Sequence, residues 1–412
     1  MNAEILAVGT ELLMGQIANT NAQYLSRRFA ELGIDVYYHS VVGDNPRRLK
    51  DALIRALERS DIVITTGGLG PTKDDLTKET IAEALGLPLV VHQESLDYIK
   101  AFFSKLNRPM CENNVKQAYL PAGSKVVPNR NGTAPGCIVE QGGKVVIMLP
   151  GPPKEMIPMF DETVFPFFEG KTGHIIGSRL VKVFGMGESE VETRLMDLVE
   201  QQSNPTIAPY VGYGDISLRV TAKCRNRDEA EALIAPVVEK IRERLGACVY
   251  SDSGESMEEV VLKLLSEKGW TLSTAESCTG GMLASRLINI PGASRVFDRG
   301  FVTYSNAAKV QELGVSQKTL EAFGAVSRET AEEMATRLVE RTKTNAGLAV
   351  TGIAGPDGGT PEKPVGLVYV AACLNGRTES LKLNLRGDRE RIRTVSCLHA
   401  LDLLRRMLLG IQ

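Results

Sequence analysis

Short apolar runs alternate with amphipathic segments along the first part of the chain. Each run is rich in Val and Ile and ends beside a Gly-rich or polar stretch. The runs lie at residues 5–8, 36–42, 61–66 and 144–148. Apolar residues with helical spacing mark two intervening segments, near 21–32 and 49–60. Continuous apolar runs are typical of parallel strands that helices cover on both faces. The pattern therefore predicts an α/β domain with a parallel sheet over residues 1–170.

The pattern changes twice further along the chain. After Ser178, strand-like and helix-like segments alternate in the order β-α-β-α-β, which predicts a small α+β connecting domain over 171–252. Its size and order resemble KH-type modules, although it lacks the GxxG loop that clamps a nucleic-acid backbone. A second α/β unit follows over 253–412 and closes with a long helix at 389–409. We therefore expect a three-domain α/β protein.

The composition is that of an ordinary globular protein, and it narrows the possible partners. The chain has 412 residues, with 48 Lys and Arg against 50 Asp and Glu, which gives a formal charge of −2. This balance argues against broad binding of nucleic acid and against a polybasic membrane surface. No apolar run approaches the roughly 18 residues of a membrane span, and the start lacks a signal-peptide pattern. We expect a cytoplasmic protein without nucleic-acid or membrane partners.

Cysteine and histidine usage argues against two common kinds of site. Seven Cys are scattered without a CxxC, which indicates reduced thiols rather than a disulfide framework. The four His include no HExxH and no paired-ligand spacing. We therefore expect neither a His-based zinc site nor a His-containing catalytic triad.

The richest polar string of the first domain is TTGGLGPTKDDLTKE. Gly67 and Gly68 end a strand there, so their backbone amides can approach an anion without a Cβ in the way. Lys73 can neutralise phosphate. Three carboxylates of the kind that hold hard divalent cations follow it, namely Asp74, Asp75 and Glu79. Asp75 and Glu79 would share one face if both lay on a helix. The alternative is a glycine turn before a solvated acidic helix start.

Other polar residues also follow predicted strands of this domain. They are Thr10 and Glu11 in GTELL, Asn131 in NRNGTAPG and Gly151 in LPGPP. Because the carboxyl ends of parallel strands share one edge of a sheet, we expect these clusters to converge on a ligand. Neither the GxxxxGK[ST] P-loop nor the GxGxxG dinucleotide pattern occurs in the sequence.

In the last domain, the string STAESCTGGMLASRL places a serine in a turn between a strand and a helix. Ser277 and Thr279 would lie at the helix amino terminus, where the free amides of Gly280 and Gly281 can stabilise an oxyanion. This arrangement is analogous to a nucleophile elbow, although the GxSxG pattern is absent. The alternative is that either hydroxyl merely caps the helix.

A base for Ser277 would have to be a residue other than histidine, because no motif of this domain contains one. The string TYSNAAKV holds Tyr304 and Lys309 near a strand end. A desolvated, neutral Lys can accept a proton from a serine, and Tyr304 could relay a proton or donate a hydrogen bond. The alternative for Lys309 is a solvated lysine at a helix start.

A third string, TGIAGPDGGTPEKPVG, follows a strand that ends at Thr351. Its glycines suit a loop that wraps closely around a phosphate or a ribose. They include Gly352, Gly355, Gly358 and Gly359. The basic run at 386–393 could supply an arginine to a phosphate, or could be a solvated helix start.

Together, GTELL, TTGGLGPTKDD, NGTAPG and LPGPP resemble the amino-terminal domain of the CinA family, and the resemblance extends over the whole chain. That domain is similar to the molybdopterin-binding fold. The resemblance implies an ADP-ribose pyrophosphatase that needs a divalent cation (Mg, Mn or Co) and yields AMP and ribose 5-phosphate. In molybdopterin-binding relatives the Asp after the Gly-Gly turn is a functional carboxylate, and Asp75 matches it best. Asp74 and Glu79 would join Asp75 at the metal, and Lys73 would contact phosphate.

ESCTGG, YSNxxK and TGIAGPxGG resemble the nicotinamide-nucleotide amidohydrolase domain called PncC. This resemblance implies hydrolysis of nicotinamide mononucleotide to nicotinic acid mononucleotide and ammonia, without a cofactor. Ser277 would be the nucleophile and Lys309 the base, with Tyr304 and Thr351 assisting. We therefore expect a bifunctional hydrolase of pyridine-nucleotide salvage, and the family suggests a homodimer. Two other functions stay open, namely a molybdopterin-handling protein and a non-enzymatic competence or DNA-repair accessory protein.

Overall fold

The computed structural model describes residues 1–169, 171, 173 and 175–411. The chain divides into two compact units, one formed by 1–177 with 223–231 and the other by 178–222 with 232–412. The boundaries of the three expected domains remain predictions. The boundary at residue 170 lies outside the described residues.

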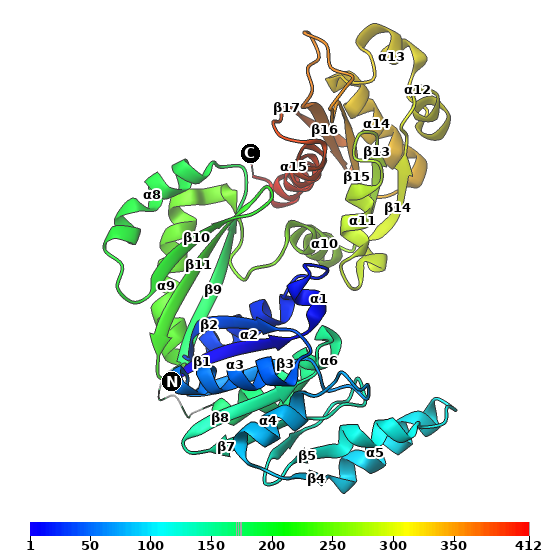
Figure 1. The fold of residues 1–412 in the computed structure, drawn as a ribbon. Helices are drawn as coiled ribbons and strands as arrows, with labels where there is room; N and C mark the ends of the chain where they lie inside the picture. Colours follow the sequence, from blue (N-terminus) through cyan, green and yellow to red (C-terminus); the bar gives the residue numbers. More distant parts are fainter. Residues whose placement is uncertain (170, 172, 174, 412) are drawn as a thin grey trace. The chain divides into compact units, whose positions relative to one another are not determined.

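The first unit is built on a six-stranded sheet with the order β2-β1-β3-β8-β7-β6 (Figure 1). The strands are β1 (Asn2–Val8), β2 (Asp35–Val42), β3 (Ile62–Thr66), β6 (Lys125–Val127), β7 (Gly136–Gln141) and β8 (Lys144–Leu149). The first four in spatial order are parallel, whereas β7 and β6 are antiparallel. The prediction of a parallel sheet therefore holds for these four strands and is wrong at the β7–β6 edge. Only Gly142 and Gly143, both with positive φ, join β7 to β8, and a two-residue turn can join only antiparallel strands.

Helices cover both faces of this sheet. They are α2 (Thr20–Glu31), α3 (Pro46–Arg59), α4 (Thr77–Leu85) and α6 (Pro153–Met159). Ile5 and Ile64 pack in one core cluster with α2 and α6, and their sequence neighbours Leu6 and Val63 pack in another with α3 and α4. Because side chains alternate along a strand, this division shows that both faces are buried, as the continuous apolar runs predict.

Short elements complete the first unit. They are α1 (Thr10–Leu13), a two-stranded sheet of β4 (Leu89–Val91) and β5 (Tyr119–Pro121), α5 (Gln93–Lys105), η1 (Glu112–Ala118), η2 (Phe160–Val164) and α7 (Phe165–Phe168). Where β3 ends, Gly67 has a φ of 102°, and a Cβ there would lie 2.2 Å from the carbonyl oxygen of Val8. Glycine is therefore required at this strand end, where β1 and β3 finish side by side.

A four-stranded sheet with the order β10-β11-β9-β12 follows in the sequence. Its strands are β9 (Ile175–Val183), β10 (Thr206–Val211), β11 (Ile216–Cys224) and β12 (Val249–Ser251), and its helices are α8 (Glu188–Glu200), α9 (Arg227–Leu245) and the short η3 (Gly246–Cys248). The sequence pattern missed β10, which is an edge strand with largely exposed residues and an internal Pro209. Proline is tolerated on an edge strand, but it weakens the signal by which a strand is recognised.

The last part of the chain forms a five-stranded sheet with the order β14-β13-β15-β16-β17. The strands are β13 (Leu272–Glu276), β14 (Phe297–Val302), β15 (Ala346–Gly352), β16 (Leu367–Leu374) and β17 (Arg377–Asn384). The helices are α10 (Met257–Glu267), α11 (Met282–Ile288), α12 (Asn306–Ala308), α13 (Gln317–Phe323), α14 (Arg328–Thr342) and α15 (Arg389–Leu409), with η4 (Ala293–Arg295) and η5 (Lys309–Leu313) between them. β14, β13 and β15 are parallel, and β16 and β17 are antiparallel additions.

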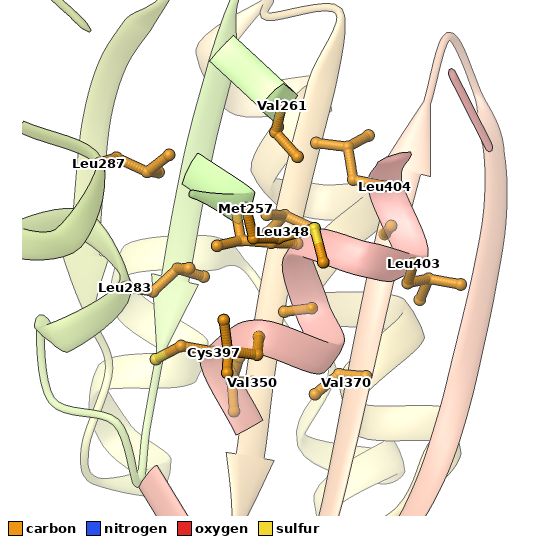
Figure 2. Close-up of a cluster of buried hydrophobic side chains, with 14 of the residues drawn as sticks. Met257, Val261, Leu283, Leu287, Leu348, Val350, Val370, Cys397, Leu403 and Leu404 are labelled. Carbon is orange, nitrogen blue, oxygen red and sulfur yellow. The ribbon is translucent and has the colours of Figure 1, made fainter. Parts of the chain in front are cut away.

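Two buried clusters lie on opposite faces of this sheet. Leu348 and Val350 of β15 belong to a cluster with residues of α10, α11 and α15 (Figure 2). Ala349, between them, belongs to the cluster that includes α14. The closing helix spans the predicted residues, 389–409, whereas the polar edge strand β17 was not predicted. The mixed α/β fold class is confirmed. Among the helices of the described ranges, none combines the length and apolar character that a membrane span requires.

Candidate active sites

Ser277 and Lys309 meet in the last domain. Ser277 directly follows β13 and donates its backbone N–H to the carbonyl of Val350 in the neighbouring strand. Lys309 begins η5, after a short helix that the Ser305 hydroxyl caps. Lys309 Nζ lies 3.1 Å from Ser277 Oγ, and Lys309 is 1% exposed. The structure therefore pairs a buried amine with the hydroxyl, as a serine nucleophile and a lysine base require.

The other partners of Lys309 orient its nitrogen. Nζ also lies 2.9 Å from the carbonyl oxygen of Thr303 and 3.5 Å from that of Tyr304. Carbonyls only accept, so they take the two N–H groups of a neutral amine and leave its lone pair to face the Ser277 hydroxyl. Burial lowers the pKa of Lys309 from its ordinary value, because a charged ammonium loses its hydration there. Both effects favour a lysine that can accept a proton.

Glu276 occupies the amino terminus of α11. Its buried carboxylate accepts hydrogen bonds from the backbone N–H groups of Gly281 and Leu283, each at 3.0 Å, and of Ala284 at 2.8 Å. The N–H of Gly280 donates to the carbonyl of Ser277. The expectation that the amides of Gly280 and Gly281 are free for an oxyanion is therefore wrong, because both are already paired.

A different pair of amides is available beside the nucleophile. Within the described ranges, the backbone N–H groups of Cys278 and Thr279 make no hydrogen bond to another residue, and the buried Thr279 hydroxyl also has no partner. The N–H of the residue that follows a nucleophile is a common oxyanion donor. The turn therefore retains two donors next to Ser277.

Two arginines of α15 reach the loops around Ser277. Arg393 donates through Nη2 to the carbonyl of Thr279, 2.5 Å away, and its buried Nε has no hydrogen-bond partner among the described residues. Arg389 donates to the carbonyl of Gly355 at 2.6 Å and lies 3.5 Å from the Tyr304 hydroxyl. The basic run, the serine turn and the Gly-rich loop thus come together at one place.

Other residues expected at this site have different partners. Tyr304 is 63% exposed. Its hydroxyl lies near Arg389, and its carbonyl rather than its phenol contacts Lys309. The buried Thr351 hydroxyl donates to the carbonyl of Ala325 at 2.7 Å. Gly352 follows Thr351 at the end of β15, and Gly358 and Gly359 lie in the exposed loop beyond it. Their assignment to substrate binding stays a prediction.

The first domain contains a cavity of about 490 Å³ at the carboxyl ends of its parallel strands. Five acidic residues line it, and we call it the acidic cavity: Glu11, Asp44, Asp74, Asp75 and Glu155. Gly67, Gly68 and Gly151 also line it. The clusters that follow separate strands therefore converge on one cavity, as expected at this edge of an α/β sheet.

Local hydrogen bonds fix two carboxylates of the acidic cavity. Asp75 Oδ2 accepts from the backbone N–H of Thr72 at 3.0 Å and from the Thr72 hydroxyl. Asp44 Oδ2 accepts from the N–H and the hydroxyl of Thr10, at 3.0 and 2.8 Å. Thr10 therefore holds the Asp44 carboxylate in place, and Asp44 is a residue that the sequence motifs did not indicate. Its signal was its position two residues after the predicted strand at 36–42.

Four residues predicted for this site do not line the acidic cavity, namely Thr10, Lys73, Glu79 and Asn131. Asp75 precedes α4, which begins at Thr77, so Asp75 and Glu79 do not share a helix face. Glu79 instead pairs with Lys116 at 3.3 Å. Asn131 donates to the carbonyl of Lys154 at 2.8 Å. Of the three carboxylates predicted to bind the metal, Asp74 and Asp75 line the acidic cavity.

The lining of the acidic cavity fits a hard divalent cation that binds together with phosphate. In the part of the chain that the structure describes, no three His, Cys, Asp or Glu side chains form a ready-made metal cage. Mg²⁺ in phosphate-transfer sites is usually held by one or two carboxylates and the substrate phosphates. Separate carboxylates around one cavity meet that requirement, so the donor set fits the expected cation.

The fold and the two sites define a multidomain α/β protein. Its first domain matches the family model of a probable molybdopterin binding domain over residues 4–170. The middle segment matches the damage-inducible protein CinA KH domain over 178–251, and the last domain matches the CinA C-terminal domain over 254–408.

Relatives of full length identify the family. The chain is 57% identical to a putative competence-damage inducible protein of Acetivibrio thermocellus over 412 residues, which is 100% of both chains. It is 54% identical to a CinA-like protein of Dictyoglomus thermophilum, over 100% of both. The chain belongs to the CinA family. A crystal structure of competence/damage inducible protein CihA from Agrobacterium tumefaciens covers 36% of this chain and 91% of its own, with 46% identity and a TM-score of 0.36.

Proposed function

We propose that the last domain deamidates nicotinamide mononucleotide to nicotinic acid mononucleotide and ammonia. The observation that carries this proposal is the buried contact of 3.1 Å between Lys309 Nζ and Ser277 Oγ. The resemblance of ESCTGG, YSNxxK and TGIAGPxGG to nicotinamide-nucleotide amidohydrolases supports the substrate. Arg393, with a buried Nε that lacks a partner among the described residues, supports an anionic group such as the substrate phosphate.

The reaction would proceed in two stages. Ser277 Oγ bonds to the amide carbon while its proton passes to Lys309 Nζ, and the amide N–H groups of Cys278 and Thr279 stabilise the oxyanion. The carbon–nitrogen bond then breaks, and the leaving nitrogen takes the proton from Lys309 to depart as ammonia. A water molecule attacks the resulting ester, gives its proton to Lys309, and releases the carboxylic acid as Ser277 regains its proton.

A comparison of two substrates tests this proposal. The pure protein in EDTA is incubated with nicotinamide mononucleotide or with nicotinamide riboside, which lacks the phosphate. We expect ammonia from the mononucleotide in a 1:1 ratio with the acid product, and a much lower kcat/KM for the riboside. Replacing Arg393 by Met should lower kcat/KM for the mononucleotide and leave that for the riboside nearly unchanged. If the wild-type protein releases no ammonia from the mononucleotide or from the riboside, the proposal is wrong.

The acidic cavity supports a second proposed activity, the hydrolysis of ADP-ribose to AMP and ribose 5-phosphate. A water oxygen would bond to one phosphorus as the bridging P–O bond breaks. Asp74 and Asp75 would hold a divalent cation, which offsets the charge of the phosphates when bound. The backbone amides of Gly67 and Gly68 would approach a phosphate oxygen closely, because no Cβ covers them.

ADP-ribose is the substrate that tests the second activity. We expect AMP and ribose 5-phosphate in equal amounts with Mg²⁺, Mn²⁺ or Co²⁺, and none after chelation. A protein that binds a molybdopterin but leaves ADP-ribose intact under all three metals would favour the molybdopterin-handling alternative. A non-enzymatic DNA-binding role is disfavoured by the balance of 48 basic and 50 acidic residues. We further propose a cytoplasmic homodimer.

A further inference from the structure

The Gly-rich loop that follows β15 is held by two basic side chains. We define this loop as residues 352–366. Arg389 of α15 donates to the carbonyl of Gly355, at 2.6 Å, near the start of the loop. Lys363 lies near the end of the loop, is half-buried, and donates to carbonyls at the junction of α13 and α14. Residues 356–362, between these two contacts, are all exposed.

The junction of α13 and α14 presents several carbonyl oxygens to the loop. Lys363 Nζ donates to those of Phe323 and Val326, each 2.8 Å away. Between them, the carbonyl of Ala325 accepts the buried Thr351 hydroxyl at 2.7 Å. Carbonyls at the end of a helix carry partial negative charge, and hydrogen bonds from a charged donor are stronger than those between neutral groups. Lys363 therefore makes the charged contact that holds the returning arm of the loop.

The loop offers backbone donors next to the strand that supports Ser277. Within the described ranges, the N–H groups of Gly355, Gly358 and Gly359 make no hydrogen bond to another residue. Gly355 and Gly358 have positive φ, 76° and 87°, and backbone amides in turns of this kind form concavities that bind anions. The loop follows β15, whose Val350 carbonyl accepts the backbone N–H of Ser277. These amides therefore suit the ribose phosphate of the substrate that Ser277 attacks.

We propose that Lys363 is a positioning residue of the deamidase, which holds the Gly-rich loop in the conformation that binds the ribose phosphate. The inference rests on the proposed deamidase function and adds a residue to it. Lys363 acts through the loop, because its ammonium is engaged by the carbonyls of Phe323 and Val326. Without this contact the substrate has to order the loop when it binds, which lowers affinity. The chemical step at Ser277 is unchanged once the substrate is bound.

Steady-state kinetics of the full-length protein with nicotinamide mononucleotide test this role. Lys363→Met keeps the length of the side chain and removes its charged donor. The loss of a hydrogen bond from a charged group should raise KM about 10- to 150-fold. The value of kcat should stay within about twofold of wild type, because a loss of ground-state binding raises KM alone. An unchanged KM, or a fall in kcat at unchanged KM, would overturn the inference.

Two matched variants separate the charged donor from a general effect on the fold. Lys363→Arg keeps a charged group with several N–H donors, so its KM should lie much closer to that of wild type than the KM of Lys363→Met does. Lys318→Met removes an exposed lysine of α13 and should change neither KM nor kcat. Equal KM values for Lys363→Arg and Lys363→Met would overturn the inference, as would an equal rise in KM for Lys318→Met.

Amide hydrogen exchange gives a readout that requires no turnover. The backbone N–H groups of Ile353, Thr360 and Gly366 donate to carbonyls within or beside the loop. In the protein without substrate they should exchange faster in Lys363→Met than in wild type, whereas the amides of β13 should be unchanged. Equal exchange of the loop amides in both proteins would overturn the inference. Faster exchange of the loop in a protein whose wild type releases no ammonia would retain Lys363 as the residue that holds the loop and reject the proposed deamidase.

Discussion

Replacing Lys309 by Met tests the proposed chemistry of the last domain most sharply. Methionine is similar in length but has no nitrogen to accept the Ser277 proton, and Lys309 is 1% exposed, so water has little access to replace it. A general base contributes about 10²–10⁴-fold to a rate. Lys309→Met should therefore lower kcat for nicotinamide mononucleotide by that factor. Lys309→Arg should lose nearly as much, because a guanidinium cannot be deprotonated in a protein.

The pH dependence of the reaction rate and of the unfolding free energy tests the same assignment of Lys309. Because burial lowers the pKa of Lys309, the wild-type rate should rise with pH through an ionisation below that of free lysine, about 10.4. Below its lowered pKa, Lys309 is a buried ammonium that costs stability, and that cost falls as pH rises from the lowered pKa to the ordinary value of about 10.4. The difference in unfolding free energy between Lys309→Met and wild type should therefore shift in favour of wild type over that interval.

Two controls make the result interpretable. Lys318→Met removes an exposed lysine of α13 and should leave both the rate and the pH dependence unchanged. The double variant Ser277→Ala with Lys309→Met should be no slower than either single variant, because residues that act as one unit lose activity non-additively. A Lys309→Arg enzyme with normal turnover would refute the assignment of Lys309 as the base.

Three further changes separate the two sites and test the turn. The amide of Glu276→Gln cannot accept all three backbone hydrogen bonds. The variant should therefore lose about 1–3 kcal/mol in the free energy of unfolding, measured in urea, and should have a lower deamidase kcat. If neither quantity changed, Glu276 would have no positioning role. Asp75→Asn should abolish cleavage of ADP-ribose while ammonia release persists, and loss of both activities in a folded variant would contradict two independent sites. EDTA should stop only the ADP-ribose reaction, so metal-restored ammonia release would exclude a serine mechanism without metal.

The sequence predicts most of the α/β elements because their strands are buried on both faces. β3 and β13 are continuous apolar or small-residue runs without competing signals. By contrast, β10 and β17 are edge strands that keep polar or exposed side chains, so neither alternation nor hydrophobicity marks them. Elements that do not depend on core burial leave a weak pattern in the sequence.

The candidate sites could be predicted as motifs, but not as hydrogen-bond networks. The pairing of Ser277 with Lys309 follows from motif strings that the resemblance relates to one another. The carboxylate of Glu276 accepts hydrogen bonds from the amides of α11, a contact that no sequence pattern predicts. Asp44 reaches its site from a segment without a recognised motif, and the basic run at 386–393 did not indicate which of its arginines would reach Thr279. Their contacts depend on tertiary positions of loops and helix starts, which hydrophobic periodicity does not encode.

Ammonia release from nicotinamide mononucleotide, measured side by side for wild type and Ser277→Ala in EDTA, tests the central claim most directly. The account predicts one ammonia per nicotinic acid mononucleotide from wild type. It predicts a rate at least about 10³-fold lower from Ser277→Ala, with unchanged circular dichroism. Wild-type protein that releases no ammonia, or a Ser277→Ala variant that releases it at the wild-type rate, would contradict the account.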